Sequence, residues 1–494
     1  MQEQEWTPMT HENAPEAPPI SYFRRHMDNA MMGIVMTMFT LNFLGLNFLL
    51  YTIGILLMLT AFRALRKVSR AFFVCYVLSI AKAALHFPLL ILNATIYNEA
   101  FTASPLSAVV NYGGVVITVL LIFFLRSGIR TAQKTVGMEP HSGSLSCLLV
   151  FALLFFTNMH LSGFLILIIL LVAVIIVVRC LFGLVRELDE AGFTVEPAPV
   201  RIPNSRLVGG ILLVLAVGII CGYAFGNRYS MDWQVVSSGE HAEAQEIKEQ
   251  LLKLHFPEYV LNDLTAEDIL ACQGALDVVV QTEDHPANDG REVWTTSANY
   301  TQVETVYDVE ELRITGVAVQ LPGEREEWML FHHFLWTQNP GFHGTEALQL
   351  WPATREFHWT PGREFTGRLL YDNDSSTYAA PYHSLGSDTY THDSIFWGPS
   401  QQTDTFATFS MPRSGENHRG YVAYSILENQ EGTIVDSWVN YIHKKSSIQY
   451  PVQTAKQYRM NGGMFSRGPF RIIQDALQFR PLENGVDLIG EPEI

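Results

Sequence analysis

The chain changes its hydrophobic pattern halfway along its length. Residues 1–226 contain six long apolar runs, and a helix that crosses lipid takes roughly 20 such residues. The runs are 43–62, 71–92, 107–125, 144–159, 163–184 and 207–225, and 144–159 is the shortest. The pattern therefore predicts a transmembrane domain over 31–226, a bundle of about six helices.

A shorter apolar piece at 31–41 comes before the first predicted span. Asn42, Gly45 and Asn47 interrupt the sequence between this piece and the run that follows. We interpret 31–41 as an interfacial or re-entrant helix, with a tight hairpin through the membrane as the alternative. Residues 1–30 are predicted to form a polar tail.

After Gly226 the long apolar runs end, and apolar residues recur at the spacing of a helix or of a strand. Residues 227–274 carry leucines at helical intervals, and Thr265 with Asp268 resembles a capping box, so a membrane-proximal helical segment is predicted. From 275 to 494 the runs are β-branched and aromatic, with alternation that predicts strands. They are 275–281, 311–321, 327–337, 366–372, 404–410, 419–427 and 433–443. Strands in sequence predict an extracytoplasmic, mainly-β domain, an antiparallel sheet or sandwich of the α+β class, with 471–479 as a last helix or edge strand.

The balance of basic and acidic residues also changes near residue 226. Residues 1–226 carry 14 Lys and Arg against 11 Asp and Glu, whereas residues 227–494 carry 18 against 38. Three alternate loops, 63–70, 126–143 and 185–206, hold ten Lys and Arg, and the loops between them hold none. Because basic loops stay in the cytoplasm, the acidic C-terminal domain is predicted to lie outside it, in a multi-pass protein of the cell membrane.

Two observations bear on the N-terminus and on the source. Six spans place both termini outside, whereas Arg24 and Arg25 favour the cytoplasm and would lie there if 31–41 crossed with 43–62. The second half contains only Cys272, so it cannot form an internal disulfide. This composition favours a bacterial cell envelope over a secreted eukaryotic domain.

Lys82 and His86 lie one helical turn apart in the second predicted span. Lys82 is about 11 residues into that span, close to the centre of a core roughly 30 Å thick, and none of the six spans contains Asp or Glu. Three interpretations are open: a neutral Lys82 bonded to another helix, for example to Asn111 or Tyr112; an interfacial Lys82; or a polar cavity for a transported substrate. We expect the first, a structural role.

Three glycines repeat every fourth residue in the last predicted span. Gly218, Gly222 and Gly226 share one helical face, which lets another helix approach closely. Packing within the chain is the simpler expectation, and a homodimer through this span is the alternative.

The C-terminal half contains no recognisable catalytic or cofactor motif. HExxH, GxGxxG, CxxC, GxSxG, a phosphate-binding loop and an EF-hand loop are all missing from the sequence. His332 and His333 would face opposite sides of a strand, and Asp372 and Asp374 fit a solvated turn better than a calcium site. No metal or cofactor is expected, and catalysis is less expected than binding.

Aromatic residues give the best indication of a ligand. Trp351, Trp359 and Trp397 lie near predicted turns, where exposed rings can contact a carbohydrate or a peptide, although a core position is the simpler expectation for most tryptophans. A domain with a net charge near −20 repels phosphates, so nucleic acid is excluded as a partner. We therefore expect a membrane protein that displays a ligand-binding or envelope-sensing domain. A surface enzyme acting on a wall polymer and a transporter using Lys82 and His86 are the alternatives.

Overall fold

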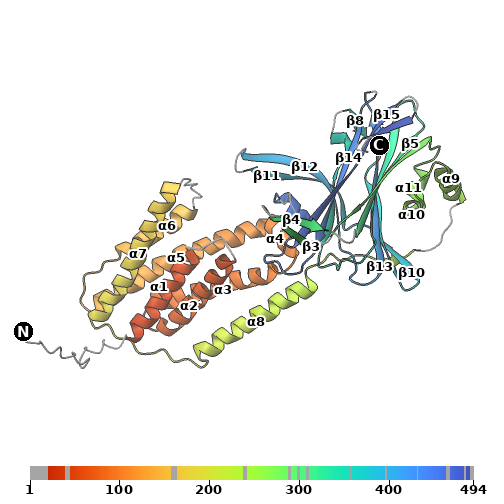
Figure 1. Ribbon diagram of the computed structural model, residues 1–494. Helices are drawn as coiled ribbons and strands as arrows, with labels where there is room; N and C mark the ends of the chain where they lie inside the picture. Colours follow the sequence, from red (N-terminus) through yellow and green to blue (C-terminus); the bar gives the residue numbers. More distant parts are fainter. Residues whose placement is uncertain are drawn as a thin grey trace, which may run out of the picture. The chain divides into compact units, whose positions relative to one another are not determined.

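The computed structural model describes residues 21–38, 45–156, 164–236, 242–287, 291–296, 301–306, 311–355, 358–394, 398–430, 432–462, 468–482 and 485–489. The chain divides into two compact units, Met1–Asn93 with Ala100–Cys221 and Ala94–Glu99 with Gly222–Ile494. The first unit is helical, and the second is built mainly from strands (Figure 1).

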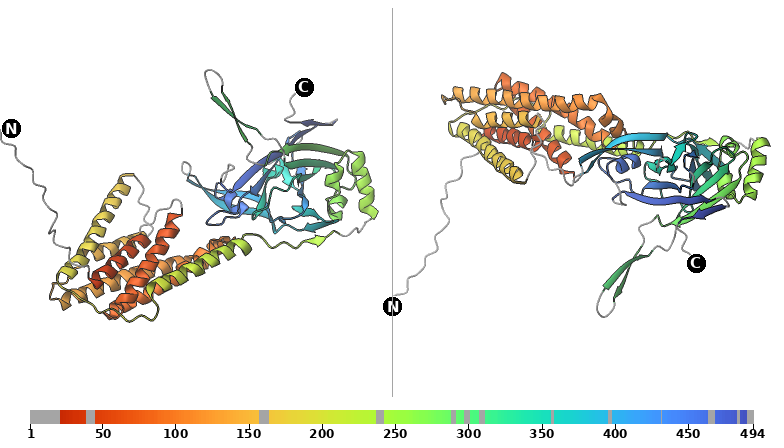
Figure 2. Two further views of the ribbon diagram at one scale, coloured as in Figure 1. Left: turned by 60° about the horizontal axis from the view of Figure 1, so that its bottom comes forward. Right: turned by 90° about the horizontal axis from the view of Figure 1, so that it is seen from above.

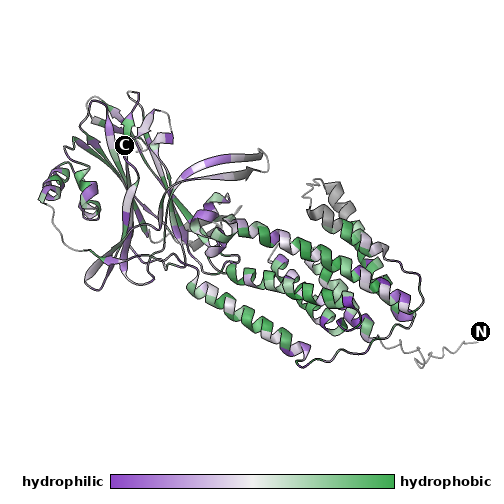
Figure 3. Cartoon of the chain, turned by 180° about the vertical axis from the view of Figure 1, so that it is seen from behind, coloured by the Kyte–Doolittle hydropathy of each residue, from purple (hydrophilic) through white to green (hydrophobic). Residues whose placement is uncertain are grey.

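The first half of the chain folds into helices joined by short connections. They are α1 (Tyr22–Met38), α2 (Leu46–Leu65), α3 (Arg70–Leu92), α4 (Tyr97–Ala103), α5 (Pro105–Thr135), α6 (Gly143–Phe156), α7 (Phe164–Glu190) and α8 (Asn204–Phe225). Apolar residues cover these helices on nearly all sides, including exposed positions such as Val116 on α5 and Leu213 on α8 (Figure 3). Such outward apolar surfaces indicate association with a membrane, because lipid solvates them as well as a protein core does.

The prediction of six membrane spans is not confirmed. Each predicted span coincides with one helix, but only α2, α3, α5 and α8 are long and apolar enough to cross a membrane among the described residues. Helix α6 has 14 residues, fewer than the roughly 20 that a span needs. Four long apolar helices are therefore established, and six spans stay a prediction.

Helix α1 begins nine residues before the predicted start at residue 31. Phe23, Met27 and Ala30 are fully buried, and their spacing of four and three places them on one face of the helix. The predicted polar tail of residues 1–30 is therefore wrong for 22–30. Helix α1 packs closely on α2, since a Cβ added at Gly33 would lie 2.6 Å from the carbonyl oxygen of Gly54.

The second unit contains two large antiparallel sheets. The eight-stranded sheet has the order β1 (Gln234–Val235), β10 (Ser376–Ala380), β9 (Thr366–Asn373), β13 (Glu416–Glu428), β6 (Glu327–Trp336), β5 (Leu312–Leu321) and β2 (Asp277–His285), with β8 (Trp359–Pro361) pairing to β13. The six-stranded sheet has the order β11 (Ser384–Ser394), β12 (Gly398–Phe409), β7 (Glu346–Trp351), β14 (Val435–Lys444), β15 (Phe470–Leu482) and β16 (Gly485–Leu488). A separate hairpin of β3 (Arg291–Thr296) and β4 (Thr301–Val306) projects from them (Figure 2).

These sheets form two of three stacked layers. Alternate residues of the eight-stranded sheet, such as Ile314 and Val422, face the six-stranded sheet and pack against Leu348 and Tyr441. The intervening residues face a layer of short helices, α9 (Ala242–Lys253), α10 (Glu258–Leu261) and α11 (Ala266–Leu270). The three helices lie in the predicted helical segment 227–274 and cover one face of the sheet, whereas residues 234–235 of that segment form the strand β1.

The antiparallel β domain is confirmed, and each of the seven predicted runs coincides with a strand. The predicted run 471–479 is the strand β15 and lies between two others, so it is neither a helix nor an edge strand. His332 and His333 face opposite sides of β6: His332 Nε2 lies 2.6 Å from Ser437 Oγ, and His333 Nε2 lies 2.9 Å from Asp263 Oδ2. Asp374 adopts a positive φ of 51° in the turn between β9 and β10.

Candidate functional site

Polar and aromatic side chains gather on one face of the six-stranded sheet. On β7, Leu348 and Leu350 point into the core, so Gln349 and Trp351 point to the opposite side. The register Phe406↔Gln349 brings β12 beside them. We name this cluster the polar face, and its residues are Gln349, Trp351, Arg355, Tyr390, Gln402, Asp404, Asn440 and Arg459.

Asp404 on β12 is the centre of the polar face. Its side chain is completely buried, and Oδ2 accepts hydrogen bonds from Gln349 Nε2 at 2.7 Å, Tyr390 OH at 2.6 Å and Gln402 Nε2 at 2.9 Å. Burial, together with the Asp404 carboxylate, raises the pKa of Tyr390, so the phenol remains a donor. Three donors therefore fix the carboxylate in one orientation.

The second oxygen of this carboxylate differs from the first in its hydrogen bonding. Asp404 Oδ1 is buried and has no hydrogen-bond partner among the described residues. The side chain of Arg355, from the short helix η1 (Ala353–Arg355), comes no closer than 3.7 Å. A buried acceptor left without a donor costs about 1–3 kcal/mol, so this oxygen is a position where a ligand donor would be stabilised.

Trp351 offers the complementary group. Its indole Nε1 is also buried and without a partner in the described parts of the chain. The guanidinium of Arg355 lies 5.1 Å from the ring of Trp351, and that of Arg459 on α12 (Ala455–Met460) lies 5.7 Å from it. Two cation–π contacts of about 0.5–2 kcal/mol each hold the ring, and its N–H remains available to an acceptor.

The other two tryptophans expected at a ligand site do not join Trp351 in the described structure. Trp359 is 2% exposed, packs in the core beside Trp328 and Tyr424, and donates its indole N–H to Ile434 O at 3.0 Å. A buried ring cannot serve as a surface platform. Trp397 lies outside the described residues.

Lys82 and His86 occupy a small polar centre inside the helical unit. Lys82 is 2% exposed, and its Nζ donates to Thr118 Oγ1 on α5 at 2.7 Å and to Thr37 Oγ1 on α1 at 3.4 Å. The ring of Tyr51 on α2 lies 5.1 Å from Nζ and 4.6 Å from the His86 ring. Thr118 and Thr37 take the place of the partners Asn111 and Tyr112 that the sequence suggested.

The hydroxyl groups around Lys82 are oriented to receive it. Thr118 Oγ1 donates its own proton to Gly114 O, and Thr37 Oγ1 donates to Ile34 O. Their lone pairs are thus left for the amine. Among the described residues, the contacts of Lys82 Nζ are with hydroxyl groups and a ring, and none is with a carboxylate, which fits a structural group better than a proton relay.

The glycine face of α8 makes contacts within the chain. A Cβ added at Gly218 would lie 2.5 Å from Ile91 Cδ1, and one at Gly226 would lie 2.6 Å from Thr95 Cγ2. Gly222, between them, is buried. Ile91 on α3 and Thr95 after it therefore contact two of the three glycines, as packing within the chain requires.

Two pairs resemble parts of a hydrolase site without forming one. His443 Nδ1 lies 2.9 Å from Glu346 Oε2, but both side chains are almost fully buried. Ser447 Oγ lies 3.2 Å from His343 Nδ1, and no carboxylate contacts that ring among the described residues. The geometry gives no support to a surface enzyme at either pair.

Sequence reasoning selected Trp351 as a candidate and did not select the carboxylate of Asp404 in the same cluster. Asp404 sits in the segment DTFATFS, which reads as an ordinary strand, and Gln349 is 55 positions away in the sequence. No family model and no curated protein matches this chain, so the polar face is judged on its geometry alone.

Proposed function

We propose that this chain is a multi-pass membrane protein whose C-terminal domain lies outside the cytoplasm and binds a carbohydrate at the polar face. The observation that carries the proposal is the pair of buried, unpartnered groups in one cluster, the acceptor Asp404 Oδ1 and the donor Trp351 Nε1. A sugar hydroxyl can both donate and accept, so one class of ligand satisfies both groups.

The strand pairing favours a carbohydrate over an extended peptide. Peptides that bind sheets pair their main chain with a free strand edge. Strand β7, which carries Gln349 and Trp351, is paired on both sides, with β12 and with β14. Recognition at this face must therefore use side chains, and a planar carboxylate, an amide, a guanidinium and an indole suit the hydroxyls of a sugar.

The location of the domain rests on charge and on the apolar helices. Four helices are long and apolar enough to span a membrane among the described residues, and the basic residues concentrate in alternate loops. A carbohydrate-binding domain outside the cytoplasm would face the polymers of the cell envelope. Binding there would make the protein an envelope receptor or sensor.

A glycan array probed with the detergent-solubilised full chain tests the proposal. We expect saturable binding to one class of glycan, weakened by about tenfold or more in Asp404→Asn and in Trp351→Phe. Asn at 404 keeps an oxygen for the three donors and places an NH₂ where Oδ1 was, and Phe at 351 removes the N–H.

The matched control is Trp294→Phe on β3, where the ring is 64% exposed and distant in sequence from the polar face. It should bind like the wild type. No glycan bound, or equal binding by all three variants, would contradict the proposal.

A further inference from the structure

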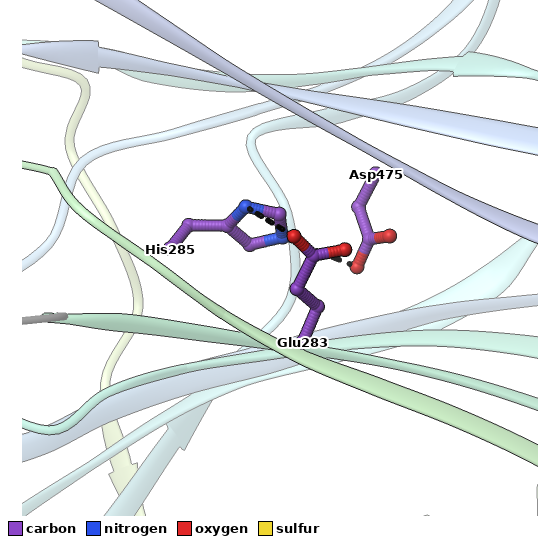
Figure 4. Close-up of side chains that lie close together, drawn as sticks. All are labelled: Glu283, His285 and Asp475. Atoms are coloured by element: carbon purple, nitrogen blue, oxygen red, sulfur yellow. Dashed lines mark ion pairs between the residues drawn. The ribbon is translucent and has the colours of Figure 1, made fainter. Parts of the chain in front are cut away.

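Three metal-ligating side chains converge between the two large sheets, away from the polar face. Glu283 and His285 are two residues apart on β2 and so point to the same side, and Asp475 comes from β15 of the other sheet (Figure 4). One ligand atom from each residue lies within 4.8 Å of the others. His285 Nε2 lies 3.4 Å from Asp475 Oδ2, and His285 Nδ1 lies 3.9 Å from Glu283 Oε1.

The imidazole at the centre lies beside two carboxylates, but its Nε2 makes no hydrogen bond of ordinary length. His285 Nε2 is buried and has no hydrogen-bond partner in the described structure, because 3.4 Å to Asp475 is longer than a good N–H···O bond. Asp475 is 9% exposed, and its Oδ1 accepts from the main-chain N–H of Ala476 at 2.7 Å. Asp475 Oδ2 is thereby left directed at the ring nitrogen.

The separation of His285 Nε2 from Asp475 Oδ2 suits two ligands of one metal ion better than a direct hydrogen bond. Ligand atoms at about 2.0–2.2 Å from a tetrahedral Zn²⁺ stand roughly 3.3–3.6 Å from one another. Glu283 Oε1 lies 3.9 Å from the other ring nitrogen, Nδ1, so the Glu283 side chain, which is 65% exposed, would turn toward Nε2 to become the third ligand. A water in the fourth position would complete the shell.

We propose that Glu283, His285 and Asp475 bind a divalent transition-metal ion, Zn²⁺ by the chemistry of one imidazole and two carboxylates. The ion joins β2, at the edge of the eight-stranded sheet, to β15 of the six-stranded sheet. The ion would cross-link the two sheets at a site separate from carbohydrate binding. The neighbouring Asp284 faces the other side of β2, where it pairs with Arg313 at 2.7 Å, and takes no part.

The test uses the full chain in detergent, stripped with EDTA and titrated with ZnCl₂ by calorimetry. We expect one saturable site, a higher unfolding temperature with Zn²⁺, and visible absorption bands of a tetrahedral complex when Co²⁺ replaces Zn²⁺. His285→Ala and Asp475→Asn should each weaken binding by about tenfold or more.

Two further variants keep the test decisive. Glu283→Gln alters an exposed side chain, so it should fold normally and still weaken Zn²⁺ binding and change the Co²⁺ spectrum. His255→Asn replaces an exposed histidine with a positive φ of 66°, which Asn tolerates, and should bind like the wild type. The proposal is overturned by the absence of saturable binding, or by Glu283→Gln and His285→Ala variants that bind Zn²⁺ as tightly as the wild type does.

Discussion

Two buried lysines, one in each unit, are stabilised in different ways. Among the residues that the structure describes, Lys82 in the helical unit contacts threonine hydroxyls and an aromatic ring. Lys444 in the β unit is fully buried, and its Nζ donates to Asn227 Oδ1 and to Gln453 O, both at 3.2 Å. Its main-chain N–H donates to the carboxylate of Glu346. Burial lowers the pKa of Lys444 to about 8, and Glu346 opposes this shift.

The difference shows that the surroundings of each unit determine which partners a buried amine can have. A helix inside lipid satisfies its own main chain, so a buried amine finds only side-chain hydroxyls and rings around it. A sheet in water can bury carboxylates and amides on alternate positions and surround an amine with them. If this account holds, the two units differ in environment, in the cost of losing a buried charge and in their response to acid.

The largest expected effect is on the labelling of each unit from outside the cell, and it is all-or-none. Ile448 is 90% exposed in the β unit, so Ile448→Cys should react with an impermeant thiol reagent in intact cells. Lys67→Cys, in a predicted cytoplasmic loop, should react only after permeabilisation. Mass-shift labelling on gels reads both. The reverse pattern would show that the ten basic loop residues do not orient this chain as predicted.

Next in size is the loss of a buried carboxylate from the β unit. Glu346 is fully buried and bonds to His443 and to the main chain of Lys444, so Glu346→Ala leaves both without their acceptor. Breaking such a buried network costs about 3–5 kcal/mol in the free energy of unfolding. Eight of the nine tryptophans lie after residue 226, so tryptophan fluorescence during denaturation follows this unit.

The control for that experiment is Glu324→Ala, at an exposed position before β6. It should change the free energy of unfolding by less than about 0.5 kcal/mol. Equal effects of the two changes would mean that the Glu346 network does not stabilise the domain.

Alternation along the chain predicted the antiparallel sheet because β5, β6, β13 and β14 carry dense β-branched and aromatic runs. Strand β11 was not predicted, because SLGSDTYTHDS is polar and reads as a loop. The run RIIQDALQF fits both helical and strand periods, and only its pairing with β14 and β16 decides between them.

The sites were less accessible to sequence reasoning than the elements. The depth of Lys82 could be counted along its span, but its partners depend on how each helix is rotated, and a helix that is apolar all round carries little information about rotation. Likewise, the aromatic content indicated Trp351, whereas Asp404 becomes visible only when the register places β12 beside β7.

A third, smaller effect tests the amine in the helical unit. Lys82→Met should change thermal stability in detergent by less than about 1 kcal/mol, because Thr37 and Thr118 keep their main-chain acceptors and no donor is left unpaired. Lys82→Glu should cost about 2.5–3.5 kcal/mol, since it places a carboxylate among oxygen atoms inside the membrane.

Expression level and the unfolding temperature in detergent give the readout. A Lys82→Met protein that folds normally and loses a cellular phenotype would contradict the structural role. Lys82 and His86 would then be examined first as a transport site.

The last expected effect is a pH dependence of the β unit that starts at one buried ring. Burial lowers the pKa of His332 from about 6.5 to about 4, and the nearby Asp475 only partly opposes this shift. The folded state therefore keeps the ring neutral while the unfolded chain takes up a proton below pH 6.5. Stability from this group is complete above pH 6.5 and is lost as the pH falls toward 4, by about 2 kcal/mol at pH 5.

His332→Gln removes the titrating ring and retains a side-chain amide that can bond to Ser437. Denaturation followed by tryptophan fluorescence should show a shallower fall in the free energy of unfolding between pH 7 and pH 5 for this variant than for the wild type, whatever its stability at pH 7. Identical slopes would mean that other groups account for the acid sensitivity of the sheet, and the buried histidine would then share the neutral, pH-independent character expected of Lys82 in the helices.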